Sequence, residues 1–255
     1  MRQTHRVQRM YEILQDKQNA STQYLSTVLD ISESTVRRDI DLLLSLYSDV
    51  RRVHGGVVMA NPREDSELMF ELKLNQNHDL KKRLARAVVE LVADGQSLIL
   101  DSGTTCLYAA MELHRKRGLR VVTTDVKIAD ELGHYEGIQS LIAGGTIRPG
   151  YYTVGDSMAV EMLGHFSVDR TIMSADAVDT QTGVTNVSVF EVGVKKKIME
   201  CARESILVAD HTKFGHTAFY RIAGLNRFSK IITTRELDAR IAEQITELGV
   251  RLLLI

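Results

Sequence analysis

The stretch LDSGTT, residues 100–105, combines a glycine with small hydroxyl side chains, after an apolar run and at the start of a helical pattern. Backbone N–H groups at a helix N-terminus favour a phosphate group, because they lack partners and the helix dipole is positive there. The same pattern is also typical of an ordinary helix cap. We interpret the stretch as a phosphate-binding loop formed by Asp101, Ser102, Gly103, Thr104 and Thr105.

Polar residues also follow other apolar runs that have the character of strands. In an open parallel sheet, ligands bind in the crevice outside the carboxyl ends of the strands, so several such ends can converge on one site. The lysine run 195–197 is expected to be a solvated helix face, with the alternative that one member reaches the crevice. Lys213, in VADHTKFG, would supply a cation for the phosphate. The residues that strand ends add to this expected site are Thr123, Thr124, Gly144, Gly145 and Lys213.

The elements that must position these residues alternate along the chain. Apolar runs of strand type lie at 97–101, 120–124, 139–143, 170–175, 205–210, 230–234 and 250–255, mostly separated by stretches of helical periodicity. Such alternation indicates βαβ units and a sheet covered by helices on both faces. The sequence therefore predicts a larger C-terminal α/β domain with a mostly parallel sheet at residues 79–255, after a linker at 59–78.

The first 58 residues carry a different pattern. Three amphipathic helices are predicted, the second entered through Ser21 and the third through Ser32, both favourable N-cap residues. At about 100° per residue, Arg38 points almost opposite the apolar face of the third helix. A helix with such an outer face fits the major groove of DNA, where arginine can bond guanine and hydroxyls can contact phosphate or base edges. The third helix would contribute Ser34, Thr35, Arg37 and Arg38.

The next segment, DVRRVHGGVV, places Arg51, Arg52 and His54 on a short strand that ends at two glycines. The freedom of glycine at positive φ suits a tight hairpin. An isolated arginine pair is more often a solvated surface, but three helices followed by a basic hairpin favour DNA binding. We therefore predict a winged helix-turn-helix domain at residues 1–58 that binds double-stranded DNA through the third helix and through Arg51, Arg52 and His54.

Composition limits the other function classes. The chain has 255 residues with 32 basic and 33 acidic ones, so any nucleic-acid binding must be local rather than a bulk attraction. Cys106 and Cys201 form no CxxC motif, and His211 and His216 lack a convincing third ligand, so we expect no disulfide, no metal and no cofactor. Without an apolar leader or an uncharged run of about 18 residues, a cytoplasmic protein without a membrane partner is expected.

These motifs, in order along nearly the whole chain, resemble the DeoR-type bacterial transcriptional regulators. The resemblance is carried by ISESTVRRDIDLL, RRVHGGVV, LDSGTT, VVTTDVKIADEL, IAGGTIRP, VKKKIMECARESILVADHTKFG and KIITT. It implies a winged helix-turn-helix joined to an effector domain that resembles ribose-5-phosphate isomerase, in proteins that usually repress sugar operons and respond to a phosphorylated sugar. Asp125 departs from the family pattern: its carboxylate either points away from the site or indicates a less anionic ligand.

Two other function classes compete with this interpretation. A sugar-phosphate isomerase needs a carboxylate base, and Asp176, Asp179 and Glu191 are available. We favour a sensor, because the DNA-binding module accounts for the whole chain and the carboxylates can bond sugar hydroxyls without proton transfer. No catalytic residue is therefore assigned, and Asp176 joins the effector site. An interaction scaffold, the third class, would bind no sugar phosphate.

The expected partners follow from this choice. They are double-stranded operator DNA and a phosphorylated sugar effector. Because a single small module buries too little DNA for high specificity, a homodimer or homotetramer is also expected.

Overall fold

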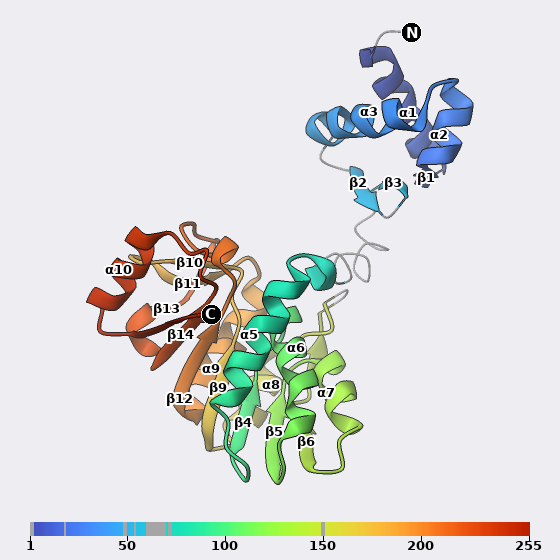
Figure 1. Ribbon diagram of the computed structural model, residues 1–255. Coiled ribbons are helices and arrows are strands. Elements are labelled where there is room, and N and C mark those ends of the chain that lie inside the picture. The colour runs from blue at the N-terminus through green and yellow to red at the C-terminus, as the bar shows by residue number, and fades with distance from the viewer. Residues whose placement is uncertain are drawn as a thin grey trace. The chain divides into compact units, whose positions relative to one another are not determined.

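The computed structural model describes residues 3–17, 19–47, 50–53, 55–59, 70, 73–148 and 151–255. The chain divides into two compact units, Met1–Leu68 and Met69–Ile255 (Figure 1). His54, together with most of the expected linker at 59–78, lies outside the described residues.

The first unit contains three helices and a small antiparallel sheet of strand order β1-β3-β2. The Ser21 and Ser32 side chains accept the N–H groups of Tyr24 and Thr35, so both expected N-caps are confirmed. Gly55 turns the hairpin with a φ of 82°, a conformation that glycine adopts without strain. The elements are α1 (Gln3–Lys17), β1 (Asn19–Ser21), α2 (Thr22–Leu29), α3 (Glu33–Leu46), β2 (Val50–Val53) and β3 (Gly56–Met59).

The second unit is built on a seven-stranded sheet of order β15-β14-β12-β9-β4-β5-β6, whose neighbouring strands are all parallel. The predicted α/β class with a mostly parallel sheet is confirmed. All seven strands overlap the apolar runs of the sequence: β4 (Ser97–Leu100), β5 (Leu119–Thr123), β6 (Ile138–Ile142), β9 (Val168–Met173), β12 (Ala202–Val208), β14 (Lys230–Thr233) and β15 (Arg251–Leu254).

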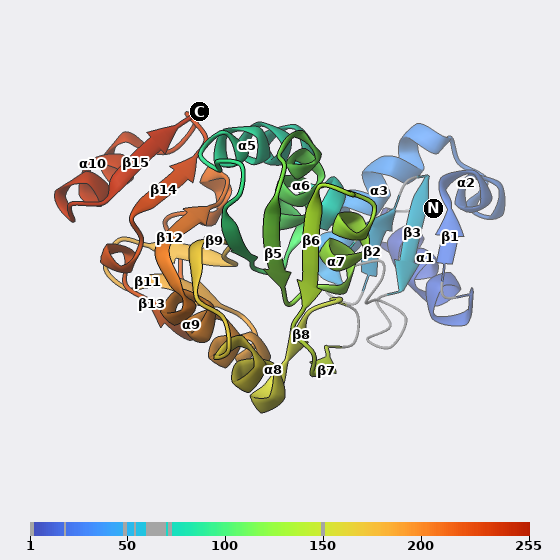
Figure 2. The same cartoon turned by 90° about the horizontal axis from the view of Figure 1, so that it is seen from below.

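Helices cover both faces of this sheet (Figure 2). Because successive side chains of a strand point to opposite faces, Leu98 and Leu100 enter one core and Ile99 the other. The first core includes residues of α5 (His78–Glu90), α6 (Thr104–Glu112) and α7 (Val126–Gly133). The second includes residues of α8 (Asp156–Leu163), α9 (Val192–Cys201) and α10 (Ala239–Glu247).

Shorter elements surround the sheet, and the sequence did not predict their strands. They are the hairpin of β7 (Thr146–Ile147) and β8 (Val154–Gly155), and a second antiparallel sheet of β10 (Ala177–Asp179), β11 (Gly183–Asn186) and β13 (Tyr220–Ala223). Single-turn helices in the described ranges include η1 (Leu113–Arg115), η2 (Val189–Glu191), η3 (His211–Lys213) and η4 (Leu225–Arg227).

The strand order has a direct consequence for the location of a site. From β4, the chain continues through β5 and β6 on one side and returns to β9 on the other. The order therefore reverses between β4 and β9, and the carboxyl ends of these two neighbours flank a topological switch point. Ligands of doubly wound folds bind at such points.

Candidate effector site and DNA-binding surface

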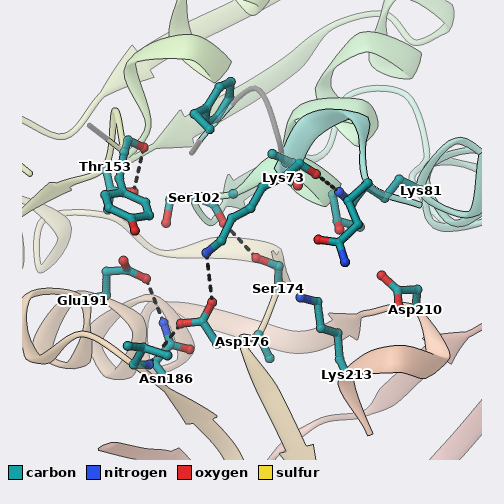
Figure 3. Close-up of a pocket in the computed structure, with 18 of the residues that line it drawn as sticks. Lys73, Lys81, Ser102, Thr153, Ser174, Asp176, Asn186, Glu191, Asp210 and Lys213 are labelled. Atoms are coloured by element: carbon teal, nitrogen blue, oxygen red, sulfur yellow. Dashed lines mark hydrogen bonds and ion pairs between the residues drawn. The ribbon is translucent and has the colours of Figure 1, made fainter. Parts of the chain in front are cut away.

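A cavity of about 180 Å³ lies at this switch point. Its walls come from the segments that follow β4, β9 and β12, from the segment that runs from the end of β11 into α9, from the β7–β8 hairpin and from residues 73–81 (Figure 3). Residues 73–78, which the sequence analysis assigned to the linker, thus belong to the second unit and contribute to this wall.

Six of the residues expected at the effector site line this cavity. They are Ser102, Gly103, Thr104, Thr105, Asp176 and Lys213.

The other expected residues do not line it. Thr123 and Thr124 are fully buried, and Gly144 and Gly145 lie on the exposed end beyond β6. The reason is the strand order, since β5 and β6 lie on the side of β4 away from β9. Asp101 lies beneath the cavity floor, 1% exposed.

Asp101 forms a buried ion pair with Lys195 under the loop. The same carboxylate accepts the N–H of Ser174 at 3.1 Å, and the Lys195 amine also donates to the Ser174 carbonyl at 3.1 Å. Burial would lower the pKa of Lys195, but Asp101 and Glu191 outweigh it and raise the pKa. The expected solvated face is therefore wrong for Lys195, which is 2% exposed and lines the cavity, so the alternative that one member of the run reaches the crevice is confirmed; Lys196 is exposed.

Asp125 caps α7, and this decides between the two alternatives left by the sequence. Its carboxylate accepts the N–H groups of Lys127 at 2.9 Å, Ile128 at 3.1 Å and Gly103 at 3.3 Å. Burial raises the pKa of Asp125 to about 6, although these three N–H groups act to lower it. The carboxylate thus faces backbone amides. Asp125 is not one of the described residues that line the cavity.

Lys81 and Lys213 lie on one side of the cavity together with Asp210. The side chain of Lys81 is 4% exposed and donates to the Lys73 carbonyl. Burial lowers the pKa of Lys81 to about 8, with Asp210 acting to raise it and Lys213 and Lys73 to lower it. Lys213 forms no ion pair within the described ranges, and in Figure 3 its amine points toward Ser174. The Ser174 hydroxyl in turn donates to the carbonyl of Ser102 at 2.8 Å.

The N-terminus of α6 faces the same cavity. Gly103 precedes the helix with a φ of 110°, and a Cβ at this position would come within 2.9 Å of the Ser174 hydroxyl. Asp125 occupies the Gly103 N–H, but the N–H groups of the first helical turn have no intrahelical acceptor. Thr104 and Thr105, in this first turn, both line the cavity. An anion at this position is favoured by the helix dipole.

Two carboxylates lie on the other side of the cavity, each with a basic partner. Glu191 is 2.8 Å from Arg148 and accepts the Asn186 amide at 2.8 Å. Asp176 is 3.7 Å from Lys73 and accepts the Val187 N–H at 3.0 Å.

The environments of these carboxylates shift their pKa values in opposite directions. Burial raises the pKa of Glu191, although Lys195 and Arg148 act against it. Burial also acts to raise the pKa of Asp176, but Lys73, the Val187 N–H, Lys195 and Lys213 together lower it. Asp176 is therefore the more firmly ionised of the two.

Several lining residues were not found from the sequence. Ser174 and Asp210 directly follow β9 and β12, so the rule of strand ends could have found both. Lys73, Asn77 and Lys81 precede the first strand of the sheet, where that rule gives no signal. Asn186 ends β11 of the small antiparallel sheet, whose strands the sequence did not predict, and Glu191 was named only as a carboxylate available to an isomerase.

The predicted DNA-contacting residues of the first unit lie along the N-terminal half of α3. Ser34, Arg37 and Arg38 are exposed and Thr35 is half-buried. Arg37 is 3.2 Å from Glu33. Arg38 forms no ion pair within the part of the chain that the structure describes. The Ser32 hydroxyl is 2.9 Å from those of Ser34 and Thr35, so the hydroxyls gather at the start of the helix.

The β2–β3 hairpin follows this helix in the chain. It carries Arg51 and Arg52, and both side chains are exposed. Arg52 is 2.7 Å from Asp41 and donates to the Arg37 carbonyl at 3.4 Å, so it is held against α3. Successive residues of a strand point to opposite faces, and Arg51 therefore lies on the other face of the hairpin.

Within the described residues, no group of three or more His, Cys, Asp or Glu side chains could hold a metal ion. No helix in those ranges is both long and apolar enough to cross a bilayer.

Comparison with known proteins decides the family. The model of the DeoR C-terminal sensor domain matches residues 76–235, and the model of the DeoR-like helix-turn-helix domain matches residues 6–63. The chain belongs to the DeoR family. The first match covers the unit with the cavity and the second covers α1 to β3, as the resemblance of the motifs implied.

Individual relatives agree with this assignment. The sgc region transcriptional regulator of Escherichia coli K12 is 38% identical over 98% of this chain and 95% of its own. The glycerol-3-phosphate regulon repressor of Haemophilus influenzae is 32% identical over 91% of this chain and 90% of its own. This DeoR-family protein is therefore a DNA-binding transcriptional regulator rather than an isomerase.

Among solved structures, ribose 5-phosphate isomerase A from Methanocaldococcus jannaschii is 21% identical, with a TM-score of 0.41 and 55% of each chain covered.

Proposed function

We propose that this DeoR-family protein represses genes for the uptake or catabolism of a sugar, and that a phosphorylated sugar bound in the cavity controls it in the cytoplasm. The relative from Haemophilus influenzae is named for a regulon of a phosphorylated compound, glycerol 3-phosphate. The observation that carries the proposal is that the N-terminus of α6 and the amine of Lys213 border one cavity. This combination suits a phosphate dianion.

In this proposal the phosphate lies at the start of α6. The amides of the first helical turn and the hydroxyls of Ser102, Thr104 and Thr105 donate to its oxygens, and Lys213 and Lys81 balance its charge. Asp101 and Lys195 both bond to Ser174, whose hydroxyl donates to the carbonyl of Ser102, and Lys195 itself lines the cavity.

On the DNA side, α3 enters the major groove and the hairpin contacts the sugar-phosphate backbone. Arg38 is the residue best placed to contact a base, since it is exposed and the described residues give it no ion pair. Arg52 and Arg37 are exposed beside acidic partners, which they would exchange for phosphates on binding. Arg51 and His54 are proposed as further backbone contacts.

The regulator is proposed to act as a homodimer or homotetramer. A DNA module of this size buries too little surface for high specificity alone, and two copies of α3 can contact repeated half-sites.

Residues 73–77 offer a physical route between the two functions. Together with Phe70, they are the part of the cavity wall that comes soonest in the chain after the DNA-binding unit. Lys73 contacts Asp176 and lies 5.3 Å from the centre of the Tyr151 ring, while Asn77 contacts Asp210. A ligand that changes these contacts changes how this segment is held, and only such a difference can bias the DNA-bound state.

The proposal is tested with the full chain in two assays. A thermal-shift screen uses phosphorylated sugars, with each unphosphorylated parent sugar as its matched control. The compounds that raise the melting temperature are then added to a gel-shift assay with DNA from upstream of the gene itself and of its neighbours. We expect phosphorylated members alone to stabilise the protein and to change the affinity for one of these DNA fragments.

Three outcomes would overturn the proposal. They are equal stabilisation by a parent sugar, no stabilisation by any phosphorylated sugar, or turnover of ribose 5-phosphate by the pure protein. The last would favour the isomerase.

A further inference from the structure

Arg52, on the β2–β3 hairpin, is held against α3 by two acceptors that lie about one helical turn apart. Its Nη2 donates to the Asp41 carboxylate at 2.7 Å and to the Arg37 carbonyl at 3.4 Å. Residues four positions apart lie on the same side of a helix, so the guanidinium of Arg52 lies along one side of α3. The hairpin is thus joined by a side chain to the helix that is proposed to enter the major groove.

These two bonds leave most of the Arg52 guanidinium available. A guanidinium carries N–H donors on three nitrogens in one plane, and both bonds use only Nη2. Within the described residues, no acceptor takes the N–H groups of Nε or Nη1. Arg52 also lines a hollow between α2, α3 and the hairpin, together with Arg37, Ser21 and Gln23. A DNA phosphate at this hollow can therefore be bound without the release of Asp41.

The alternative for Asp41 is a solvated charge that has no part in recognition. Arg52 is 50% exposed and Asp41 68% exposed, and an ion pair so exposed adds little to the free energy of unfolding. A carboxylate on a surface that faces DNA also repels the phosphates, so removal of its charge alone should strengthen binding to any duplex. A role in holding Arg52 predicts the opposite for a specific sequence, where binding should become weaker.

Resting on the DNA contacts proposed above, we propose that Asp41 is a positioning residue for DNA recognition. It fixes the direction of the Arg52 guanidinium, whose remaining N–H groups then contact a phosphate that is correctly placed only when α3 lies in its specific register. Phosphate contacts set the register and orientation of a protein on a duplex. The exchange of an acidic partner for a phosphate is thereby limited to Arg37, because Arg52 keeps Asp41 in the specific complex.

The test measures a specificity ratio, which is the affinity for a specific duplex divided by the affinity for a scrambled duplex of the same composition. The unmodified full chain selects the specific duplex from a pool of random sequence, and fluorescence anisotropy at one fixed salt concentration gives both affinities. Asp41→Ala removes the acceptor and should lower the ratio severalfold, with binding to the scrambled duplex unchanged or tighter. Because Asp41 is exposed within a helix and alanine is a good helix former, this variant keeps the fold.

Two further variants separate the acceptor from the charge. Asp41→Asn keeps an acceptor oxygen without the charge, so it should retain more of the ratio than Asp41→Ala. Asp16→Ala makes the same change at an exposed position of α1 and is the matched control, which should leave the ratio intact. A ratio in Asp41→Ala that equals or exceeds that of the unmodified protein would overturn the proposal. Equal ratios in Asp41→Ala and Asp41→Asn would do the same, because only the charge would then matter.

The route through Arg52 is tested by combining substitutions. In the background of Arg52→Ala, the change Asp41→Ala should cause no further loss of the ratio. An undiminished loss would show that Asp41 acts without Arg52, which would refute its positioning role. If the random pool yields no preferred duplex, the DNA contacts proposed above fail as well, and this outcome differs from an unchanged ratio in Asp41→Ala.

Discussion

Arg38 is the side chain of α3 whose role in DNA binding can be tested most directly. It is exposed and without an ion pair in the described ranges, so its replacement removes no contact that stabilises the fold. Arg38→Ala is expected to weaken operator binding by about 1 to 3 kcal/mol, the usual value of an arginine that bonds a base. A fluorescence titration with labelled operator measures this. Arg9→Ala is the control, because Arg9 is exposed on α1 outside the predicted contact surface. Equal affinities of the two variants would contradict the assignment.

Lys81 makes a pH dependence of anion binding predictable. Burial lowers its pKa to about 8 in the free protein, and an adjacent phosphate dianion would favour its charged form. The complex therefore binds more protons than the free protein above about pH 8, and the affinity must fall as the pH rises through this value.

For a single proton the dissociation constant should increase by up to about tenfold per pH unit. Calorimetric titration with inorganic phosphate from pH 7 to 9.5 measures the slope. Lys81→Gln should bind more weakly at pH 7 and lose most of the dependence. A constant affinity of the unmodified protein over this range would contradict the placement of the phosphate.

The site was predictable from the sequence only where a residue lies within a few positions after a strand. LDSGTT and Lys213 follow β4 and β12, and both line the cavity. Thr123 and Gly144 satisfy the same local rule but lie elsewhere, because the order of strands in the sheet decides which ends meet. Strand order depends on tertiary packing, and no local pattern encodes it.

At the scale of elements, the central sheet was predictable and the small one was not. Strands that are buried on both faces consist of apolar runs, which stand out in any sequence. The strands β10 (AVD) and β11 (GVTN) are only three and four residues long, and β11 pairs with β13 from a distant part of the chain. Their pairing follows from packing against the large sheet rather than from their own composition.

The pair of Lys195 and Asp101 joins α9 to the ends of β4 and β9, and its loss should destabilise the second unit. Lys195→Met leaves a buried carboxylate without its counter-charge, which costs about 3 to 5 kcal/mol. Urea unfolding of the full chain, followed by circular dichroism, measures the change. Lys196→Met is a matched control one residue along, where the side chain is exposed, and should have little effect.

A double variant tests whether the unpaired charge of Asp101 causes this loss. Lys195→Met combined with Asp101→Asn should be more stable than Lys195→Met alone, because no charge is then left unpaired. If the double variant is the less stable, the bond from the Ser174 N–H to the Asp101 carboxylate outweighs the unpaired charge, and the expected cost of that charge is refuted.

At the scale of the whole molecule, the regulator must convert a small ligand into a change of DNA affinity. The units at 1–68 and 69–255 each have their own hydrophobic core. The chain that connects them enters the second unit at residues that border the cavity, among them Lys73 and Asn77. A ligand bound in the cavity would therefore contact the segment that connects the two units. The coupling is then reciprocal, because DNA must change the affinity for the ligand by the same factor as the ligand changes the affinity for DNA.

A substitution at Asn77 can remove the side-chain contacts that are proposed to couple ligand binding to DNA binding, without a change in the backbone conformation. Its φ of 55° is left-handed, and Gly adopts this conformation readily, so Asn77→Gly keeps the chain path while removing the contacts to Asp210 at 3.4 Å and Thr212 at 3.3 Å. Operator affinity without ligand should remain within about twofold, whereas the change of affinity caused by a saturating sugar phosphate from the thermal-shift screen should shrink severalfold. Operator titrations with and without that compound measure both quantities. Asn226→Gly, at an exposed asparagine of η4 outside the cavity lining, serves as the control. If both variants keep the full change of operator affinity on addition of the sugar phosphate, the proposed role of Asn77 is refuted. The coupling must then pass through other contacts of residues 73–77.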